Sequence, residues 1–136
     1  MALDLITKIF FTAFFISLLY ELLHSILYKT CLNAPLKKYV YLILKAAIFD
    51  GFAISAMYYL TYLIFNNQDI FSNYYQLILF FSISLMFAYA WEIYSIKAGK
   101  WEYSDRMPLI LGVGITPVIQ LFLTGLLSIY IVFYIY

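Results

Sequence analysis

Charged residues are scarce in this chain of 136 residues, because Asp, Glu, Lys and Arg together make up only 11% of it. An ordinary soluble domain carries about 25% charged residues, so the composition argues against that class. The single cysteine, Cys31, excludes a disulfide within the chain, and no Cys/His spacing indicates structural zinc. The net charge of +1 provides no basic surface for nucleic acid. We therefore predict no nucleic-acid partner, no structural metal and no cofactor.

Hydrophobic residues make up 66% of the chain and gather in four long runs. Crossing about 30 Å of hydrocarbon takes about 20 helical residues, and each run is long enough. The runs lack the alternation of a transmembrane barrel, so helices are the expected form. Short connections between consecutive helices favour antiparallel neighbours. The sequence thus predicts one all-α domain over residues 1–136, a polytopic, antiparallel four-helix transmembrane bundle surrounded by membrane lipid, with spans at Leu5–Tyr28, Tyr39–Phe65, Ile70–Ile96 and Pro108–Phe133.

Basic residues predict the orientation of this bundle. They concentrate in the first and third connections, the second connection has none, and the N-terminus has only Lys8. Connections rich in Lys and Arg stay in the cytoplasm. We therefore expect a multi-pass protein of the cytoplasmic (inner) membrane with both termini on the non-cytoplasmic side. The six basic residues that set this orientation are Lys29, Lys37, Lys38, Lys97, Lys100 and Arg106.

Three acidic residues, Glu21, Asp50 and Glu92, lie inside hydrophobic runs. A carboxylate near the bilayer centre costs at least a few kcal/mol, so it normally faces a bundle interior, a partner group or a water-filled cavity. Residues three or four apart share a helix face, which places Ser17, Glu21, His24 and Tyr28 on one polar stripe. A second stripe surrounds Glu92, and a third runs along the last span through Gly112, Thr116, Gln120, Thr124 and Ser128. Close packing of the helices explains why Ser, Thr and Gly occur on these stripes. It does not explain why carboxylates occur there, since a small residue would pack as well without the cost of a charge.

The depths of these residues predict a polar cleft open to the cytoplasm. Glu92, His24 and Glu21 lie one to two turns from the cytoplasmic ends of their helices. Asp50 and Gln120 lie near the middle of the bilayer and would form the floor. Lys45 is on a different helix face from Asp50, so we expect it to reach toward the headgroups.

Four kinds of chemistry fit such a cleft. Glu21 and His24 form a Glu-x-x-His pair of the kind that binds metal in carboxylate bundles, but only one pair exists. A buried carboxylic acid could instead donate a proton to a lipophilic substrate. Acidic residues at graded depths could relay protons or cations, for which so small a chain would need to oligomerise. Finally, the ionisable residues could hold the bundle together or bind a partner membrane subunit without turnover.

The third connection carries a motif, Gly99-x-Trp101-x-Tyr103, that is followed by Pro108 and Pro117. Pro108 fits the first turn of a helix, and Pro117 would then kink that helix and free the carbonyl of Val113. Trp101 and Tyr103 alternate with acidic residues.

This stretch of about thirty residues resembles the lycopene-cyclase-like membrane proteins of carotenoid biosynthesis. In these, a Gly-x-Trp-x-Tyr loop precedes a helix that carries a proline followed by acidic residues. The resemblance implies a related bundle and an isoprenoid substrate. The chain departs from the pattern where the acids should follow Pro117, because Val118, Ile119 and Gln120 stand there. If those acids protonate the polyene, this chain lacks them in its last helix.

The leading hypothesis is a small membrane enzyme, or a subunit of one, that handles a lipid or isoprenoid by acid–base chemistry. Glu92 and Glu21 are the acid–base candidates, with His24 as their partner. The substrate-binding candidates are Asp50, Gln120, Thr116, Trp101 and Tyr103, of which the two aromatic residues would cover the mouth. The alternative is a non-catalytic oligomer that uses the same residues for transport, for a relay or for assembly.

Overall fold

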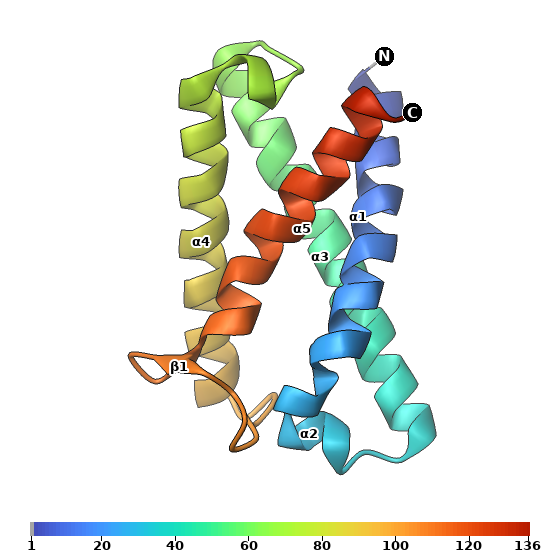
Figure 1. Ribbon diagram of the computed structural model, residues 1–136, viewed down its shortest axis with the longest axis vertical. Coiled ribbons are helices and arrows are strands. Elements are labelled where there is room, and N and C mark those ends of the chain that lie inside the picture. Colours follow the sequence, from blue (N-terminus) through green and yellow to red (C-terminus); the bar gives the residue numbers. More distant parts are fainter. Residues whose placement is uncertain (1) are drawn as a thin grey trace.

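Four long helices dominate the computed structural model, which describes residues 2–136 (Figure 1). They are α1 (Ala2–His24), α3 (Leu36–Phe65), α4 (Tyr74–Lys97) and α5 (Ile115–Tyr134). Each is long and apolar enough to cross a membrane. The short elements between them are η1 (Ser25–Leu27), α2 (Lys29–Leu32), η2 (Ile70–Ser72) and the strands β1 (Leu109–Ile110) and β2 (Val113–Gly114). The predicted all-α fold with four spanning helices is confirmed.

The long helices form a ring of antiparallel neighbours. Helix α1 packs against α3 and α5, and α4 packs against α5 and α3, so sequential connections link adjacent helices. Both termini lie at one end of the bundle, together with the link between α3 and α4 (Figure 1). We call this the terminal end. The opposite end, formed by residues 25–35 and 98–114, is called the loop end, and α3 and α4 splay apart toward it (Figure 1).

The first helix ends earlier than the sequence predicts. The α-helix α1 stops at His24 and a 3₁₀ turn follows, so the helical stretch that is long enough to span ends at Leu27, one residue before the predicted Tyr28. Tyr28 is extended, with φ −112° and ψ 123°, and it forms an antiparallel bridge with Tyr103. The backbone N–H of Lys29 donates to the carbonyl of Glu102 at 2.8 Å. A hydrogen-bonded contact with a distant loop, which hydropathy does not reveal, ends the helix here.

Helix α4 begins at Tyr74 and not at the predicted Ile70. Ile70 lies in the 3₁₀ turn η2, and the side chain of Asn73 caps α4 by accepting from the backbone N–H groups of Tyr75 and Gln76. Such a cap satisfies donors that the first turn of a helix leaves free. At the other boundaries, α3 begins three residues before the predicted Tyr39, at Leu36, and ends as predicted at Phe65.

The last helix shows the largest difference. It begins at Ile115, so the predicted start at Pro108 is wrong. A tight hairpin of β1 and β2 occupies the intervening segment, with Leu111 and Gly112 at φ 51° and 80°. Positive φ at both central residues is typical of a two-residue hairpin turn. Pro117 therefore lies in the first turn of α5, where its missing N–H costs nothing, and the predicted kink is also wrong.

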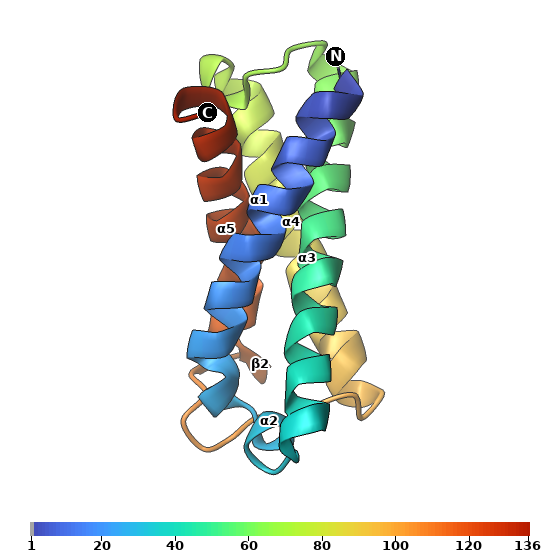
Figure 2. The same ribbon diagram turned by 90° about the vertical axis from the view of Figure 1, so that its right-hand side faces the viewer.

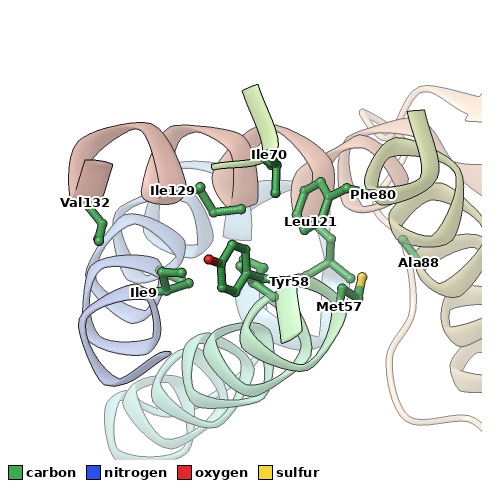
Figure 3. Close-up of a cluster of buried hydrophobic side chains, with 11 residues drawn as sticks. Ile9, Met57, Tyr58, Ile70, Phe80, Ala88, Leu121, Ile129 and Val132 are labelled. Atoms are coloured by element: carbon green, nitrogen blue, oxygen red, sulfur yellow. The ribbon is translucent and has the colours of Figure 1, made fainter. Parts of the chain in front are cut away.

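A cluster of buried apolar side chains closes the terminal half of the bundle. Figure 3 shows Tyr58 of α3 among Ile9 of α1 and Ile129 of α5, all at most 1% exposed. Phe80 of α4 joins this cluster beside Gly125 of α5. A Cβ atom at Gly125 would lie 2.8 Å from Phe80 Cζ, so any larger residue would force the buried Phe80 ring to shift. Small residues commonly allow membrane helices to approach closely, and Gly125, which lies outside the predicted polar stripe of the last span, does so here.

Candidate functional site

A cavity of about 320 Å³ lies between the helices in the loop half of the bundle. Its walls are mostly apolar, with Ala46, Phe49, Ala88, Trp91 and Leu121 among them. All three intramembrane carboxyl groups, those of Glu21, Asp50 and Glu92, also line it. Ligand sites in proteins have volumes of about 300 to 1,000 Å³ and combine apolar walls with a few polar groups, so this cavity has the size and composition of a small ligand site.

Gln120 joins two of these carboxyl groups at the inner part of the cavity. Its Nε2 donates to Glu21 Oε1 at 2.7 Å and to Asp50 Oδ2 at 2.5 Å. Asp50 and Gln120 are buried, with 8% and 3% of their surfaces exposed. One amide thus fixes carboxyl groups from α1 and α3 from its own position on α5. The sequence placed Asp50 and Gln120 together, and the structure brings Glu21 to the same level.

Glu92 is held by three donors that come from two other segments. Oε2 accepts from the Tyr103 hydroxyl at 2.6 Å and from Trp101 Nε1 at 3.1 Å. Oε1 accepts from the Tyr28 hydroxyl at 3.3 Å. Trp101 and Tyr103, which we expected to cover the mouth of the cleft, are therefore direct partners of its acid. Two of the three donors belong to the loop, so Glu92 also anchors the loop that carries both aromatic residues.

Loop 98–114 docks on the segment after α1 through further contacts (Figure 2). The Ser104 N–H donates to the Leu27 carbonyl at 2.8 Å, and the Glu102 N–H donates to Thr30 Oγ1 at 2.9 Å. An exposed ion pair joins Lys29 Nζ and Glu102 Oε1 at 3.1 Å. These contacts fix the loop across the loop end of the bundle. They also bring Tyr28 and Tyr103 to the same carboxyl group.

Burial raises the pKa of the two tyrosines that contact Glu92 from outside the spans. For Tyr28 the pKa lies well above its ordinary value, because the ring is desolvated and Glu92 lies beside it. The pKa of Tyr103 is raised mainly by burial and then by its hydrogen bond to Glu92. Both hydroxyl groups therefore stay protonated at neutral pH and remain available as donors.

His24 lies beside this network without a hydrogen bond of its own. Its Nδ1 is 3.6 Å from Glu21 Oε2, and neither ring nitrogen has a hydrogen-bond partner in the described part of the chain. The ring is buried between those of Tyr20 and Tyr28, with centroid distances of 5.0 and 5.2 Å. His24 is thus close to Glu21, as the Glu-x-x-His spacing predicts, but it is not among the residues that line the cavity.

Thr116 stands apart from the other predicted site residues. Its hydroxyl donates to Met107 Sδ at 3.3 Å, and its carbonyl accepts from the Tyr20 hydroxyl at 2.7 Å. It does not line the cavity. Its contacts join the start of α5 to α1 and to the preceding loop, which is a positional role.

Sequence reasoning missed the partner of Glu92 in the segment after α1, and it missed several cavity residues. Tyr28 was assigned only to a polar stripe, although its hydroxyl reaches Glu92. Lys45 is exposed, as expected of a residue that reaches toward the headgroups, and yet it lines the cavity together with Lys100. The first and third connections both hold basic residues and have aromatic residues in or beside them, which was the available signal that they meet. This shared composition does not predict which residues of the two connections contact each other.

Within residues 2–136, no group of three or more His, Cys, Asp or Glu side chains is arranged to hold one metal ion. The Glu21–His24 pair has its neighbouring carboxyl groups occupied by Gln120 and by the loop donors.

Comparison with known proteins does not extend these observations: no protein-family model matches the chain, and neither does any curated protein or solved structure.

Proposed function

We propose that this integral membrane protein is an enzyme, or a subunit of one, that acts on a lipid or isoprenoid by acid–base chemistry. The observation that carries the proposal is the cavity itself, in which apolar walls and three carboxyl groups face the same space. A packed apolar cluster closes the terminal half of the bundle. A lipophilic molecule inside would meet proton donors and acceptors while largely shielded from water.

Glu92 and Glu21 are the acid–base groups in this proposal. A side chain that transfers a proton must lie within hydrogen-bond reach of the substrate. Both residues line the cavity, so a substrate bound there would meet this condition. Asp50 and Gln120 orient the substrate from the inner part of the cavity, and His24 acts through Glu21. Trp101 and Tyr103 set the position of the Glu92 carboxyl group and close the loop end.

The resemblance of the loop to lycopene-cyclase-like proteins supports an isoprenoid as the substrate class. Gln120 stands in α5 where a carboxylate would be expected from that resemblance. In this chain the acid would therefore come from α1, α3 or α4. The Gln120 amide would hold two of these acids in place instead of reacting.

The distribution of basic residues supports a cytoplasmic location for the loop end, with both termini outside. Cysteine accessibility tests this orientation in a Cys31→Ser background. Ser72→Cys, at an exposed position between α3 and α4, should react with an impermeant reagent added to intact cells. Lys37→Cys, at an exposed position in the first turn of α3 next to the loop end, should react only after the membrane is opened. The opposite pattern would reverse the orientation.

Glu92→Gln in a deletion strain tests the enzymatic role. Glutamine keeps an oxygen for Trp101 and Tyr103, and its amide N–H can donate to the Tyr28 hydroxyl, so the loop should stay docked. An amide cannot exchange a proton, so the variant should fold normally and fail to restore the lipid or pigment profile of the deletion strain. Untargeted lipid analysis of the wild-type, deletion and variant strains provides the measurement. Full restoration by Glu92→Gln would refute the acid–base role.

A proton or cation relay in an oligomer is the alternative, and one observation favours it. Polar groups follow one another from Glu92 through Tyr28 and His24 to Glu21, and then through Gln120 to Asp50. A relay predicts altered ion or pH tolerance in the deletion strain with an unchanged lipid profile. An enzyme predicts the reverse, so the same strains separate the two functions.

A further inference from the structure

Two lysines at the rim of the cavity lack acidic partners. Lys45 of α3 and Lys100 of loop 98–114 both line the cavity, and both are exposed. Among the described residues, the ion pairs of lysine are Lys8 with Asp4 and Lys29 with Glu102. The ammonium groups of Lys45 and Lys100 thus bring positive charge to a cavity whose own charged groups are otherwise acidic.

Aromatic rings hold these ammonium groups near the rim. Lys100 Nζ lies 4.4 Å from the ring centroid of Trp91 and 4.7 Å from that of Tyr94. Lys45 Nζ lies 5.8 Å from the centroid of Tyr41. Cation–π contacts of this kind leave the N–H groups of an ammonium free to donate to another ligand. The two charges are therefore positioned but not neutralised.

An aromatic pair connects the two sides of the rim. Phe49 of α3 stacks on Trp91 of α4 with centroids 4.6 Å apart and an interplanar angle of 20°. Phe49 is one turn from Lys45 on the same helix, and Trp91 lies beneath Lys100. Both rings line the cavity. The stacked pair thus bridges α3 and α4, with Lys45 one turn from Phe49 and Lys100 over the Trp91 ring.

The order of charges selects one kind of ligand. A free cation would meet the lysines first, and a small anion that passed them would meet Glu21, Asp50 and Glu92. An amphiphile avoids both conflicts, because its anionic head stays between the lysines and its apolar chain enters the cavity. Lysine commonly binds phosphate as a point charge, and such contacts strengthen near an anionic lipid surface.

We propose that the cavity binds a phosphate-bearing amphiphile, with Lys45 and Lys100 on the phosphate and the hydrocarbon chain among Phe49, Trp91 and the inner carboxyl groups. This assignment rests on the proposed function, since it names the substrate class for the same cavity. The acid–base groups then act on the chain, at a distance from the head. The phosphate serves to hold the substrate at the loop end.

Tryptophan fluorescence measures binding directly, because the only two tryptophans of the chain, Trp91 and Trp101, both line the cavity. The full-length protein in a non-ionic maltoside detergent is titrated separately with monodecyl phosphate, n-decanol and inorganic phosphate. Monodecyl phosphate should give a saturable change. Decanol should bind at least tenfold more weakly, and inorganic phosphate should give no saturable change over the same range. Saturation by inorganic phosphate with equal affinity would overturn the assignment of a lipid ligand.

The double variant Lys45→Gln/Lys100→Gln tests the rim. Each lysine near an anionic group contributes about 1 kcal/mol, so the loss of both should lower the affinity for monodecyl phosphate about thirty-fold. The affinity for decanol should not change. The control is Lys37→Gln/Lys97→Gln, which removes the same charge from exposed positions of α3 and α4 next to the loop end that do not line the cavity. The control should bind like the wild type.

The outcomes separate this inference from the proposed function. Equal binding of decanol and monodecyl phosphate, with no effect of the double variant, would overturn the phosphate assignment and leave the lipophilic cavity intact. No saturable response to either amphiphile would overturn both. Equal losses in the double variant and in the control would also overturn the rim assignment, because general charge would then explain the binding.

Discussion

Tyr103→Phe should release loop 98–114 from the bundle while leaving the four long helices folded. The Tyr103 hydroxyl makes two hydrogen bonds, since it donates to Glu92 Oε2 at 2.6 Å and accepts from the Gly114 N–H at 3.0 Å. Phenylalanine keeps the ring and removes both bonds. The substitution therefore isolates the hydroxyl group from the packing of the ring.

The structure sets the size of the effect. A hydrogen bond contributes about 0.5 to 1.5 kcal/mol, or up to about 3 kcal/mol where one partner is charged, and a buried donor left without a partner costs about 1 to 3 kcal/mol. Gly114 is buried, so its N–H has no access to water once the hydroxyl is gone. Because the two terms share one group and are not additive, we expect a total of about 3 kcal/mol. This cost falls on the docking of the loop, because the helices are held by other contacts.

Hydrogen exchange measures this docking locally. The amide groups of Lys29, Glu102 and Ser104 donate across the interface between the loop and the segment after α1. When opening is fast, the loss of about 3 kcal/mol should lower their protection about 150-fold. Amides in the middle of α3 should keep their protection.

Tyr41→Phe is the matched control, because Tyr41 is 61% exposed and its hydroxyl has no hydrogen-bond partner among the described residues. It should exchange like the wild type. A loss of protection below threefold in Tyr103→Phe, or an equal loss in Tyr41→Phe, would refute the anchoring role of the hydroxyl.

Three further predictions concern other parts of the molecule. Cys31, the only cysteine, lines the cavity, and burial raises the pKa of its thiol; maleimide should therefore label it more slowly than an exposed thiol, and saturating monodecyl phosphate should slow the reaction further. Gly125→Ala should lower the stability by about 1 to 3 kcal/mol, because the new methyl group would overlap Phe80, and this loss should appear as a lower thermal midpoint in detergent. Ser128→Ala, one turn later on α5, should lower the stability less. A larger loss in Ser128→Ala than in Gly125→Ala would contradict the close packing at Gly125. Docking of the loop should weaken as the pH rises above about 10, because Tyr103 loses its proton at a lower pH in the undocked state than in the docked state, and the undocked state then binds fewer protons than the docked one. Hydrogen exchange corrected for pH should show this loss of protection in the wild type and a smaller loss in Tyr103→Phe.

The four helices could be predicted from sequence because their cause is local. Each apolar run must satisfy its backbone hydrogen bonds within itself in lipid, and length alone then indicates a span. The same reasoning placed Asp50 and Gln120 at one level, since a carboxyl group in such a run must face the interior. The polar stripe through Glu21 also predicted its side of the helix correctly.

The tertiary structure decided where the helices end and what surrounds the acids. The segment from Pro108 to Gly114 is apolar enough to continue a span, and the hairpin at Leu111 and Gly112 is what excludes it from α5. Tyr28 leaves the helical stripe because its backbone pairs with Tyr103, 75 positions later in the printed sequence.

The pairing of the two connections at the loop end likewise lies outside what local pattern encodes. Hydropathy and helical periodicity describe neighbours within one run, whereas the donors to Glu92 come from two segments brought together by the packing of the ring of helices. The same distant packing puts Lys45 and Lys100 at one rim. The sequence by itself determined that acids lie inside a membrane bundle, and only the tertiary structure decided which groups hold them, because hydrogen bonds between distant segments depend on how the helices pack.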